Sequence, residues 1–234
     1  MTDITGRVAL VTGANRGLGA AFVAELLERG AIKVYAAARR PESIVADDPR
    51  VIPLQLDVTD ADSIRRAAAV ATDVTVLVNN AGIASDQSLV SGDLDVIRHE
   101  FDTNFWGPVL ITRAFTPVLE ANGGGAVVNM HSALSWLGTG SYSATKAALW
   151  SASNSARVEL ADAGIQVVGV HVGYVDTDMA AHATGEKVPP RQVVEEALDA
   201  VAADEAEAVV GDTARYVKSH LHEDVRALYP QLAR

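Results

Sequence analysis

The chain has 234 residues, of which 49% are hydrophobic, and its 30 acidic and 19 basic residues give a formal net charge of −11. This length predicts one domain with a sizeable core, and the charge argues against nucleic acid or an anionic membrane as a partner. The sequence contains no cysteine, which excludes disulfides, thiol nucleophiles and zinc–thiolate sites. No stretch approaches the ~20 apolar residues that cross a bilayer. The first residues also lack the pattern of a signal peptide, so we expect a cytoplasmic protein.

Strand-like and helix-like segments alternate along the whole chain, as judged from hydrophobic periodicity. Because the strands are apolar along their length and are followed by helices, they predict an α/β fold with a parallel sheet covered on both faces. In the longest helical region a bend is expected near Pro108 and Pro117. In chain order the predicted elements are strand 7–13, helix 17–30, strands 33–38 and 51–58, helix 60–71, strand 74–82, helix 93–121, strand 125–132, helix 142–163, strand 165–173, helix 191–204 and strand 206–211.

Residues 212–234 show a further helical pattern, which lies beyond the last predicted strand and is not required to cover the sheet. We expect this C-terminal extension to pack on the domain or on a second subunit. No linker, fixed-period repeat or low-complexity block interrupts the sequence, so residues 1–234 are expected to form a single domain.

A glycine-rich stretch, "TGANRGLG" (12–19), joins the first predicted strand to the first helix. Glycines at these positions permit a tight turn and the close approach of a ligand, and the free N–H groups of the helix start favour a pyrophosphate. Since the motif lies between a strand and a helix, it predicts a dinucleotide site. The expected contacts are Gly13, Asn15, Arg16, Gly17, Leu18 and Gly19.

The end of the second strand bears on the choice between NAD and NADP. An acidic residue there would bind the adenosine ribose of NAD, whereas arginine accommodates the 2′-phosphate of NADP. The chain has Ala38 at that place, followed by Arg39 and Arg40, with Arg16 in the glycine loop, although surface arginines are common in loops. NADP is therefore expected over NAD. Asp57, at the end of the third strand, is placed to accept from the adenine amino group. The expected contacts at this end of the cofactor are Arg39, Asp57 and Val58.

"SYSATKAALW" (141–150) places Tyr142 and Lys146 one helical turn apart on one face. Such i,i+4 pairs are ordinary neighbours on a helix surface. The chemical alternative is that the ammonium stabilises the phenolate and lowers the pKa of the tyrosine toward the working range. The pair by itself leaves both interpretations open.

Several motifs in one order settle that question, because the chain resembles the short-chain dehydrogenase/reductase family over nearly its whole length. The resemblance implies a single Rossmann-type, doubly wound sheet of about seven parallel strands, and hydride transfer between a nicotinamide and a carbonyl or alcohol. It also implies a homodimer or homotetramer, for which helices 93–121 and 142–163 are candidate faces. The matching pieces are "TGANRGLG" (12–19), "NNAG" (79–82), Asn104, Ser132, "YSATK" (142–146) and "VGYVDTDM" (172–179).

The resemblance also implies catalytic roles. Tyr142 is expected to supply the proton, and Lys146 to lower the pKa of that tyrosine and to hold the nicotinamide ribose. Ser132 would hydrogen-bond the substrate oxygen, and Asn104 would anchor a water that connects Lys146 to solvent. A helix-distorting or capping role for Asn104 stays open. Further cofactor contacts implied in the same way are Asn80, Ala81, Gly82, Val175 and Thr177.

The chain departs from the family pattern at three places. Ser132 stands ten residues before Tyr142, fewer than is common in the family, so Ser135 is a rival for its role. Val172–Gly173 replaces the usual Pro-Gly after the sixth strand, which could relax the nicotinamide clamp. The segment that would cover the substrate, residues 179–190, is short and predicts an open site that tolerates bulky carbonyls.

Two histidines lie close to these motifs. His131 alternates to the opposite side of its strand from Ser132, and His171 lies within a predicted strand, so both are expected to be structural. Histidines and carboxylates do not cluster at metal-ligand spacing, and no metal is expected.

The leading interpretation is an NADPH-dependent reductase of small ketones or aldehydes that also oxidises secondary alcohols. One alternative is a 3-oxoacyl-thioester reductase, which a basic patch for a carrier protein would favour and this acidic chain does not show. The other is a non-catalytic NADP-sensing protein on the same fold. Such a protein would be expected to have lost Tyr142 or Lys146, and both are present.

Overall fold

The computed structural model describes residues 2–232, and within them seven strands form one parallel sheet in the order β3-β2-β1-β4-β5-β6-β7. The chain winds outward from β1 to β3 and then returns to place β4 beside β1, so the topological switch point lies between these two strands. This arrangement confirms the predicted Rossmann-type α/β sheet. The strands are β1 Val8–Thr12, β2 Lys33–Ala38, β3 Val51–Gln55, β4 Val76–Asn79, β5 Gly125–Met130, β6 Ile165–Val172 and β7 Glu207–Val210.

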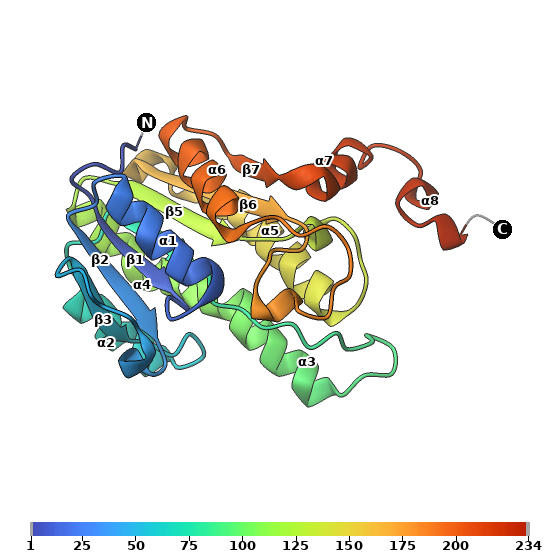
Figure 1. The fold of residues 1–234 in the computed structure, drawn as a ribbon, viewed down its shortest axis with the longest axis horizontal. Helices are drawn as coiled ribbons and strands as arrows, with labels where there is room; N and C mark the ends of the chain where they lie inside the picture. Colours follow the sequence, from blue (N-terminus) through green and yellow to red (C-terminus); the bar gives the residue numbers. More distant parts are fainter. Residues whose placement is uncertain (1, 233–234) are drawn as a thin grey trace.

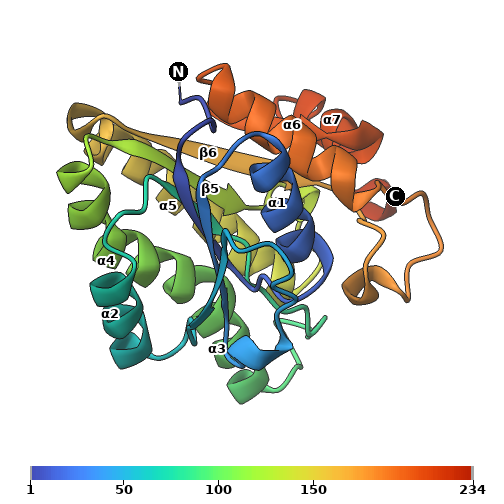
Figure 2. The same ribbon diagram turned by 60° about the vertical axis from the view of Figure 1, so that its left-hand side comes forward.

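Helices cover both faces of the sheet. Helices α1 and α6 pack on one face, and α2, α4 and α5 pack on the other, as Figures 1 and 2 show. The helices are α1 Gly17–Glu28, α2 Ala61–Val70, α3 Leu94–Phe101, α4 Gly107–Ala121, α5 Ser141–Glu159, α6 Pro190–Ala202, α7 Gly211–Ser219 and α8 Val225–Leu228. No helix in this part of the chain has the length and apolar character required to span a bilayer.

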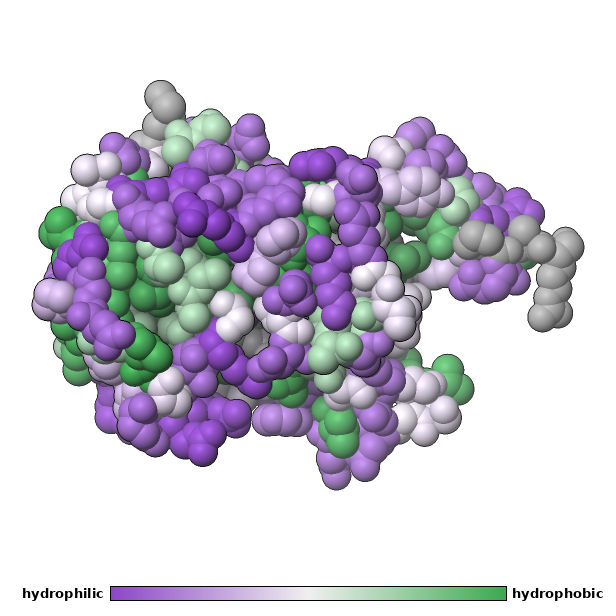
Figure 3. All heavy atoms as spheres, viewed as in Figure 1, coloured by the Kyte–Doolittle hydropathy of each residue, from purple (hydrophilic) through white to green (hydrophobic). Residues whose placement is uncertain are grey.

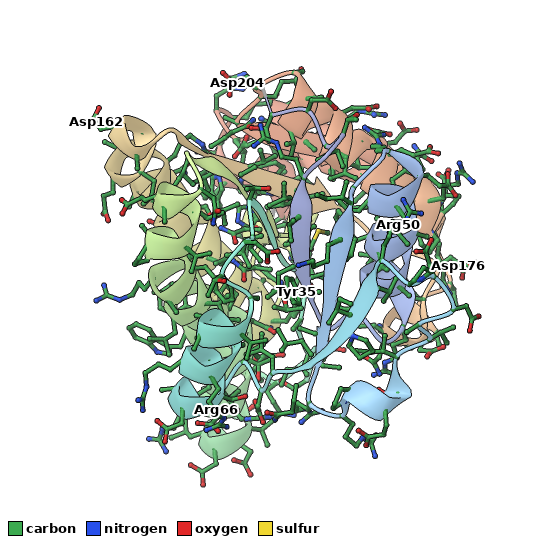
Figure 4. All side chains as sticks on the ribbon, turned by 90° about the vertical axis from the view of Figure 1, so that its left-hand side faces the viewer. Tyr35, Arg50, Arg66, Asp162, Asp176 and Asp204 are labelled. Atoms are coloured by element: carbon green, nitrogen blue, oxygen red, sulfur yellow. The ribbon has the colours of Figure 1, made fainter. Side chains whose placement is uncertain are left out.

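Each face of the sheet buries its own apolar cluster. Phe22 of α1 and Leu198 of α6 lie in one cluster, and Phe115 and Leu119 of α4 lie in the other, all fully buried. Each such side chain stabilises the fold by roughly 1.5–3 kcal/mol relative to an exposed position. The outer face of α6 is hydrophilic (Figure 3). Beside α1, Arg50 donates to two backbone carbonyls near the end of that helix (Figure 4).

The helical region 93–121 is interrupted just before Pro108, close to one of the two prolines where a bend was predicted. Residues Asp102–Trp106 form a π-helical turn between α3 and α4, and Pro117 lies inside α4. Pro108 has no N–H to bond the carbonyl of Asn104 four residues earlier. The helical hydrogen bonds widen here from a four-residue to a five-residue spacing, and the Gly107 N–H donates to the carbonyl of Asp102, five residues earlier. The distortion is therefore centred on Asn104.

Two other boundaries differ from the sequence-based expectation. The third strand ends at Gln55 rather than residue 58, because the chain turns at Asp57, whose N–H donates to the Ser63 hydroxyl. The C-terminal extension begins as α7 directly after β7, and α8 lies farther from the sheet (Figure 1). The Tyr229 hydroxyl nevertheless accepts the N–H of Gly138. Residues 233–234 of the predicted extension lie outside the described residues.

Candidate active site

The glycine loop forms a cradle at the carboxyl end of β1. Gly13 and Gly17 adopt φ of +65° and +55°, a region that side chains disfavour. A Cβ on Gly19 would lie 2.1 Å from the carbonyl oxygen of Gly13, so only glycine fits there. Asn15 and Arg16 are exposed beside this turn, and Leu18 packs against the core. The loop therefore presents the start of α1 to an approaching anion.

Thr12, which the sequence analysis did not single out, holds this loop to the end of β4. Its hydroxyl accepts the N–H groups of Asn80 and Ala81, each at 3.0 Å. The Asn80 amide in turn donates to the carbonyl oxygens of Thr12 and Gly13 at 2.8 and 3.3 Å. The side chain of Asn80 thus supports the loop, where a contact with the cofactor was predicted. The sequence feature that could have identified Thr12 is its place as a hydroxyl residue at the end of the strand, directly before the glycines.

At the ends of β2 and β3 the structure brings Arg39 close to Asp57. Ala38 is buried at the end of β2, whereas Arg39 is exposed. Burial raises the pKa of Asp57. The hydrogen bonds from the Thr59 N–H and hydroxyl, at 2.9 and 2.8 Å, and the charge of Arg39 lower it by more than burial raises it, so the net shift is downward. Val58 is buried beside them. A guanidinium and a carboxylate therefore stand at the place predicted for the adenosine.

The segment after β6 closes over the glycine loop. Val175 pairs with Val188 in an isolated bridge, so the residues between them form a loop with fixed ends. The Thr177 methyl carbon lies 3.4 Å from the position that a Cβ on Gly17 would take. Asp178 and Arg16 form an exposed ion pair at 3.4 Å. Arg16 is thus drawn toward this covering segment, and Arg39 is the arginine beside Asp57.

Tyr142 and Lys146 lie on the first turns of α5. The helix starts sharply because Gly140 adopts φ of +143° and the Ser143 hydroxyl accepts the N–H groups of Thr139 and Gly140. Lys146 is only 4% exposed, and its Nζ lies 5.7 Å from the centre of the Tyr142 ring. The same Nζ donates to the backbone carbonyl of Met130 at 2.7 Å, which directs it toward the end of β5.

The ionisation of this pair differs from the sequence-based expectation. Burial raises the pKa of Tyr142 to about 12, against a downward effect of the Ser132 hydroxyl. Burial also lowers the pKa of Lys146 to about 8, against the charge of Glu100. The net lowering of the Tyr142 pKa that was expected from Lys146 is not seen in this arrangement, because desolvation of the phenol dominates. At pH 7 Tyr142 retains its proton and is suited to donate it.

Ser132 and Ser135 occupy different hydrogen-bonding roles. Ser132 precedes a short 3₁₀ turn, and its Oγ accepts the Leu134 N–H at 3.1 Å. Its hydroxyl donates only a long hydrogen bond, of 3.5 Å, to the Val172 carbonyl, and it acts on the nearby Tyr142. The Ser135 hydroxyl instead accepts the N–H of Ser132 at 3.2 Å. The geometry favours Ser132 over its rival as the residue that faces a substrate oxygen.

Asn104 lies in the π-helical turn and is fully buried. Its Oδ1 accepts the Ile83 N–H at 2.9 Å, and its Nδ2 donates to the Ile83 carbonyl at 2.8 Å and to the Thr145 hydroxyl at 3.1 Å. A Cβ on Gly82 would lie 3.2 Å from this Oδ1 and 3.8 Å from Lys146 Nζ. Asn104 therefore ties the chain after β4 to α5, and its water-anchoring role stays a prediction.

Glu100, another residue that the sequence analysis missed, is fully buried near the same helix. Its Oε1 accepts the Ser85 N–H at 2.7 Å, and its charge raises the pKa of both Tyr142 and Lys146. In the sequence Glu100 resembles any acidic residue of a polar helix, so nothing there indicated that it is buried beside the site.

A cleft of about 580 Å³ borders this site. It lies between the chain after β4, the segment that joins Ser132 to Tyr142, and the second turn of α5. Its walls are partly apolar, with several hydroxyl groups. The lining residues are Ser88, Leu89, Leu134, Ser135, Trp136, Gly138, Thr139, Gly140, Ser143, Ala144 and Ala147. Ser132 and Tyr142 do not line the cleft, although residues close to each of them in the sequence do.

Comparisons with known proteins agree with this arrangement. Residues 7–187 match the family model described as short chain dehydrogenase. The chain is 37% identical to a cis-4-hydroxycyclohexanecarboxylate dehydrogenase from Sinomonas cyclohexanicum, over 88% of this chain and 92% of that protein. It is 31% identical to a 3-oxoacyl-[acyl-carrier-protein] reductase from Synechocystis sp., over 80% and 82%. A solved structure of a short chain dehydrogenase from Burkholderia cenocepacia in complex with NADP matches with a TM-score of 0.94 at 38% identity, covering 99% of both chains.

Proposed function

Because the chain belongs to the short chain dehydrogenase family of oxidoreductases, we propose that it reduces ketones or aldehydes with NADPH and reversibly oxidises the corresponding secondary alcohols. The observation that carries the proposal is that Tyr142, which keeps its proton at pH 7, lies on the first turn of α5 near enough to the Ser132 hydroxyl, just after β5, for that hydroxyl to act on its pKa. A carbonyl oxygen that gains charge during reduction needs both a hydrogen-bond donor and a proton.

Different side chains supply the hydrogen bond, the proton and the positive charge that the reduction needs. When bound, the nicotinamide cofactor supplies the hydride. Ser132 donates a hydrogen bond to the carbonyl oxygen, and Tyr142 transfers its phenolic proton to that oxygen. Lys146, mostly protonated at pH 7 with a pKa of about 8, then stabilises the phenolate and holds the ribose hydroxyls. In the oxidative direction Tyr142 takes the proton back.

The residues at the switch point fit a dinucleotide. The close approach of Gly13 and Gly19 leaves a cradle that a Cβ would fill, and it opens onto the start of α1. These features suit a pyrophosphate, which binds main-chain N–H groups at a helix N-terminus. Gly82, which follows β4, carries no side chain and so leaves space beside Lys146. We propose that Val175 and Thr177 hold the carboxamide of the nicotinamide.

The preference for NADP rests on Arg39 and on the absence of an acid at position 38. A carboxylate at the end of β2 would repel a 2′-phosphate, whereas the exposed guanidinium of Arg39 can pair with it. The Burkholderia cenocepacia structure, which was solved with NADP, supports the same choice.

A 3-oxoacyl-thioester reductase is the second candidate, favoured by the similarity to the Synechocystis enzyme. The cleft beside the site could take part of an acyl chain. The net charge of −11 disfavours docking of an acidic carrier protein. A free thioester substrate would avoid this repulsion.

The two candidates are separated by following NADPH oxidation over a panel of cyclic ketones, aldehydes and 3-oxoacyl thioesters. We expect turnover of simple ketones or aldehydes by the wild type and its loss in the Tyr142→Phe variant. Turnover restricted to acyl thioesters would replace the first candidate by the second. NADPH binding without turnover of any of these substrates would contradict both and favour a sensing role.

A further inference from the structure

A buried chain of polar side chains runs behind Ser132, across β5, β6 and β7. His171 of β6 is fully buried, and its Nδ1 lies 3.2 Å from the carbonyl oxygen of Ser132. Its Nε2 lies 3.0 Å from Nδ1 of His131 on β5 and 3.4 Å from Oε1 of Glu207 on β7. A Cβ on Gly169 would lie 2.6 Å from the His131 ring, so this glycine makes room for the imidazole. Both histidines are thus closely packed.

The partners of His131 determine where its proton lies. Ser153 donates its only hydroxyl proton to the Leu149 carbonyl at 2.8 Å. Its oxygen then accepts from the Asn129 amide at 2.8 Å and from Nε2 of His131 at 2.9 Å. Burial holds the pKa of His131 well below its ordinary value, so this ring is neutral and its Nδ1 is an acceptor.

The same argument assigns two protons to His171. Nδ1 faces only the Ser132 carbonyl, and Nε2 faces the unprotonated Nδ1 of His131 and a carboxylate oxygen of Glu207. Every one of these partners accepts a hydrogen bond, so both ring nitrogens must donate. The hydrogen-bond geometry therefore calls for a proton on each ring nitrogen of His171.

The surroundings of His171 offset the cost of burying a charge. Hydrogen bonding from His171, with further bonds from Lys218 at 2.6 Å and the Trp150 indole at 2.8 Å, holds the pKa of Glu207 well below its ordinary value against the effect of burial. The Trp136 ring stacks on His171 with centroids 3.8 Å apart and planes at 10°, the geometry of a cation–π contact. The charges of Lys146 and Arg157 on α5 oppose a further positive charge in this cluster, since both lower the pKa of the neighbouring His131.

Both ends of the turn that carries Ser132 rest on this one ring. The Ser132 carbonyl meets the edge of His171, and Trp136, which ends the 3₁₀ turn, covers its face. We propose that His171, kept doubly protonated by Glu207, is a positioning residue that holds the Ser132 hydroxyl beside Tyr142. Its catalytic consequence rests on the proposed reductase function, whereas its protonation state does not.

The protonation state is tested on the ligand-free wild type by ¹⁵N NMR of histidine-labelled protein at pH 7. We expect both ring nitrogens of His171 to carry protons and His131 to carry one, on Nε2. At pH 7 the Glu207→Gln variant should contain less doubly protonated His171 than the wild type, because the carboxylate no longer stabilises the charge. Glu205→Gln, which removes an exposed charge two residues away, is the matched control and should leave that fraction unchanged. A neutral His171 in the wild type at pH 7 would overturn the proposal, whatever the enzyme reduces.

The positioning role is tested by steady-state kinetics of the same variants. At pH 7 and below, where Lys146 is mostly protonated, kcat of Glu207→Gln should decline as pH rises and fall about tenfold or more below that of the wild type. The Kd for NADPH should stay within about twofold, since the cofactor cradle is remote from β7. A kcat–pH profile of Glu207→Gln that matches the Glu205→Gln control would overturn the positioning role. Hydrogen exchange of the Leu134 amide, which bonds Ser132 Oγ, gives an activity-independent readout and should be faster in Glu207→Gln alone.

Discussion

The two halves of the sheet use side chains in opposite ways. Around β1, β2 and β3 the candidate arginines for the cofactor phosphates, Arg16 and Arg39, are exposed in loops. Around β5 and β6 the candidate catalytic groups are buried, apart from Tyr142, which is partly exposed. Ser132 and Lys146 are 6% and 4% exposed, and Asn104 is fully enclosed.

The difference indicates what each half can contribute. A charge in water is screened and gives modest, salt-dependent binding energy. A hydroxyl or ammonium fixed in a low-dielectric site acts much more strongly on a developing charge, and it is costly to leave without a partner. We therefore expect substitutions in the second half to change kcat most and substitutions in the first half to change cofactor affinity.

The largest effect is expected for Tyr142→Phe, which retains the ring but deletes the proton donor. kcat should fall by at least the ~10²–10⁴-fold attributed to general acid catalysis, while the Kd for NADPH should barely change. Stopped-flow reduction and fluorescence titration measure the two quantities, with Tyr216→Phe, an exposed tyrosine of α7, as control. Retained turnover in Tyr142→Phe would place the acid elsewhere and remove the basis of the comparison.

Ser132→Ala ranks next, with an expected loss of ~10²-fold or more in kcat, because the carbonyl oxygen loses a positioned donor. Ser135→Ala should change kcat far less. It removes the acceptor for the Ser132 N–H, so its main effect is a loss of stability of roughly 0.5–2 kcal/mol, as for other caps. Kinetics and thermal unfolding of both variants decide the matter. A larger kcat loss in Ser135→Ala would show that the wrong serine has been named.

In the exposed half, Arg39→Ala should raise the Kd for NADPH by about 10–150-fold, the equivalent of one charge-assisted hydrogen bond of roughly 1.5–3 kcal/mol. NADH, which has no 2′-phosphate, should be little affected. Adding Ala38→Asp should reverse the preference, because the new carboxylate repels the phosphate and accepts from free ribose hydroxyls.

Arg65→Ala, a surface arginine on α2, is the control for lost charge. The affinity of the wild type for NADPH should also weaken more steeply with salt than that for NADH. Equal wild-type affinity for the two cofactors, or equal losses in Arg39→Ala, would contradict the NADP assignment.

The smallest effect concerns pH and the buried ammonium. Since burial lowers the pKa of Lys146 to about 8, its charge is present below that pH and is lost as pH rises through it. The reductive kcat/KM should therefore decline by about tenfold at pH 9, while Tyr142, with a pKa of about 12, stays protonated. Circular dichroism over the same range separates this titration from unfolding. A profile that stays flat to pH 9 would mean that Lys146 is more solvated than its position indicates.

The sequence by itself determined the order of strands and helices, the parallel sheet and the glycine loop. These features depend on hydrophobic periodicity and on the conformational freedom of residues such as Gly13 and Gly17, which are local properties of the chain. The i,i+4 relation of Tyr142 and Lys146 was likewise local. An interruption near Pro108 could also be predicted from the sequence, but its centre lies one turn earlier, at Asn104, where the missing N–H of the proline acts.

Only the tertiary structure decided how these side chains ionise and what holds them. The pKa of Tyr142 depends on burial, and the direction of Lys146 Nζ depends on a carbonyl of another strand. Asn104 meets Ile83, and His171 meets Glu207, across intervals that no local pattern encodes. Desolvation and hydrogen-bond partners arise from packing, so they became visible only when the strands and helices were assembled.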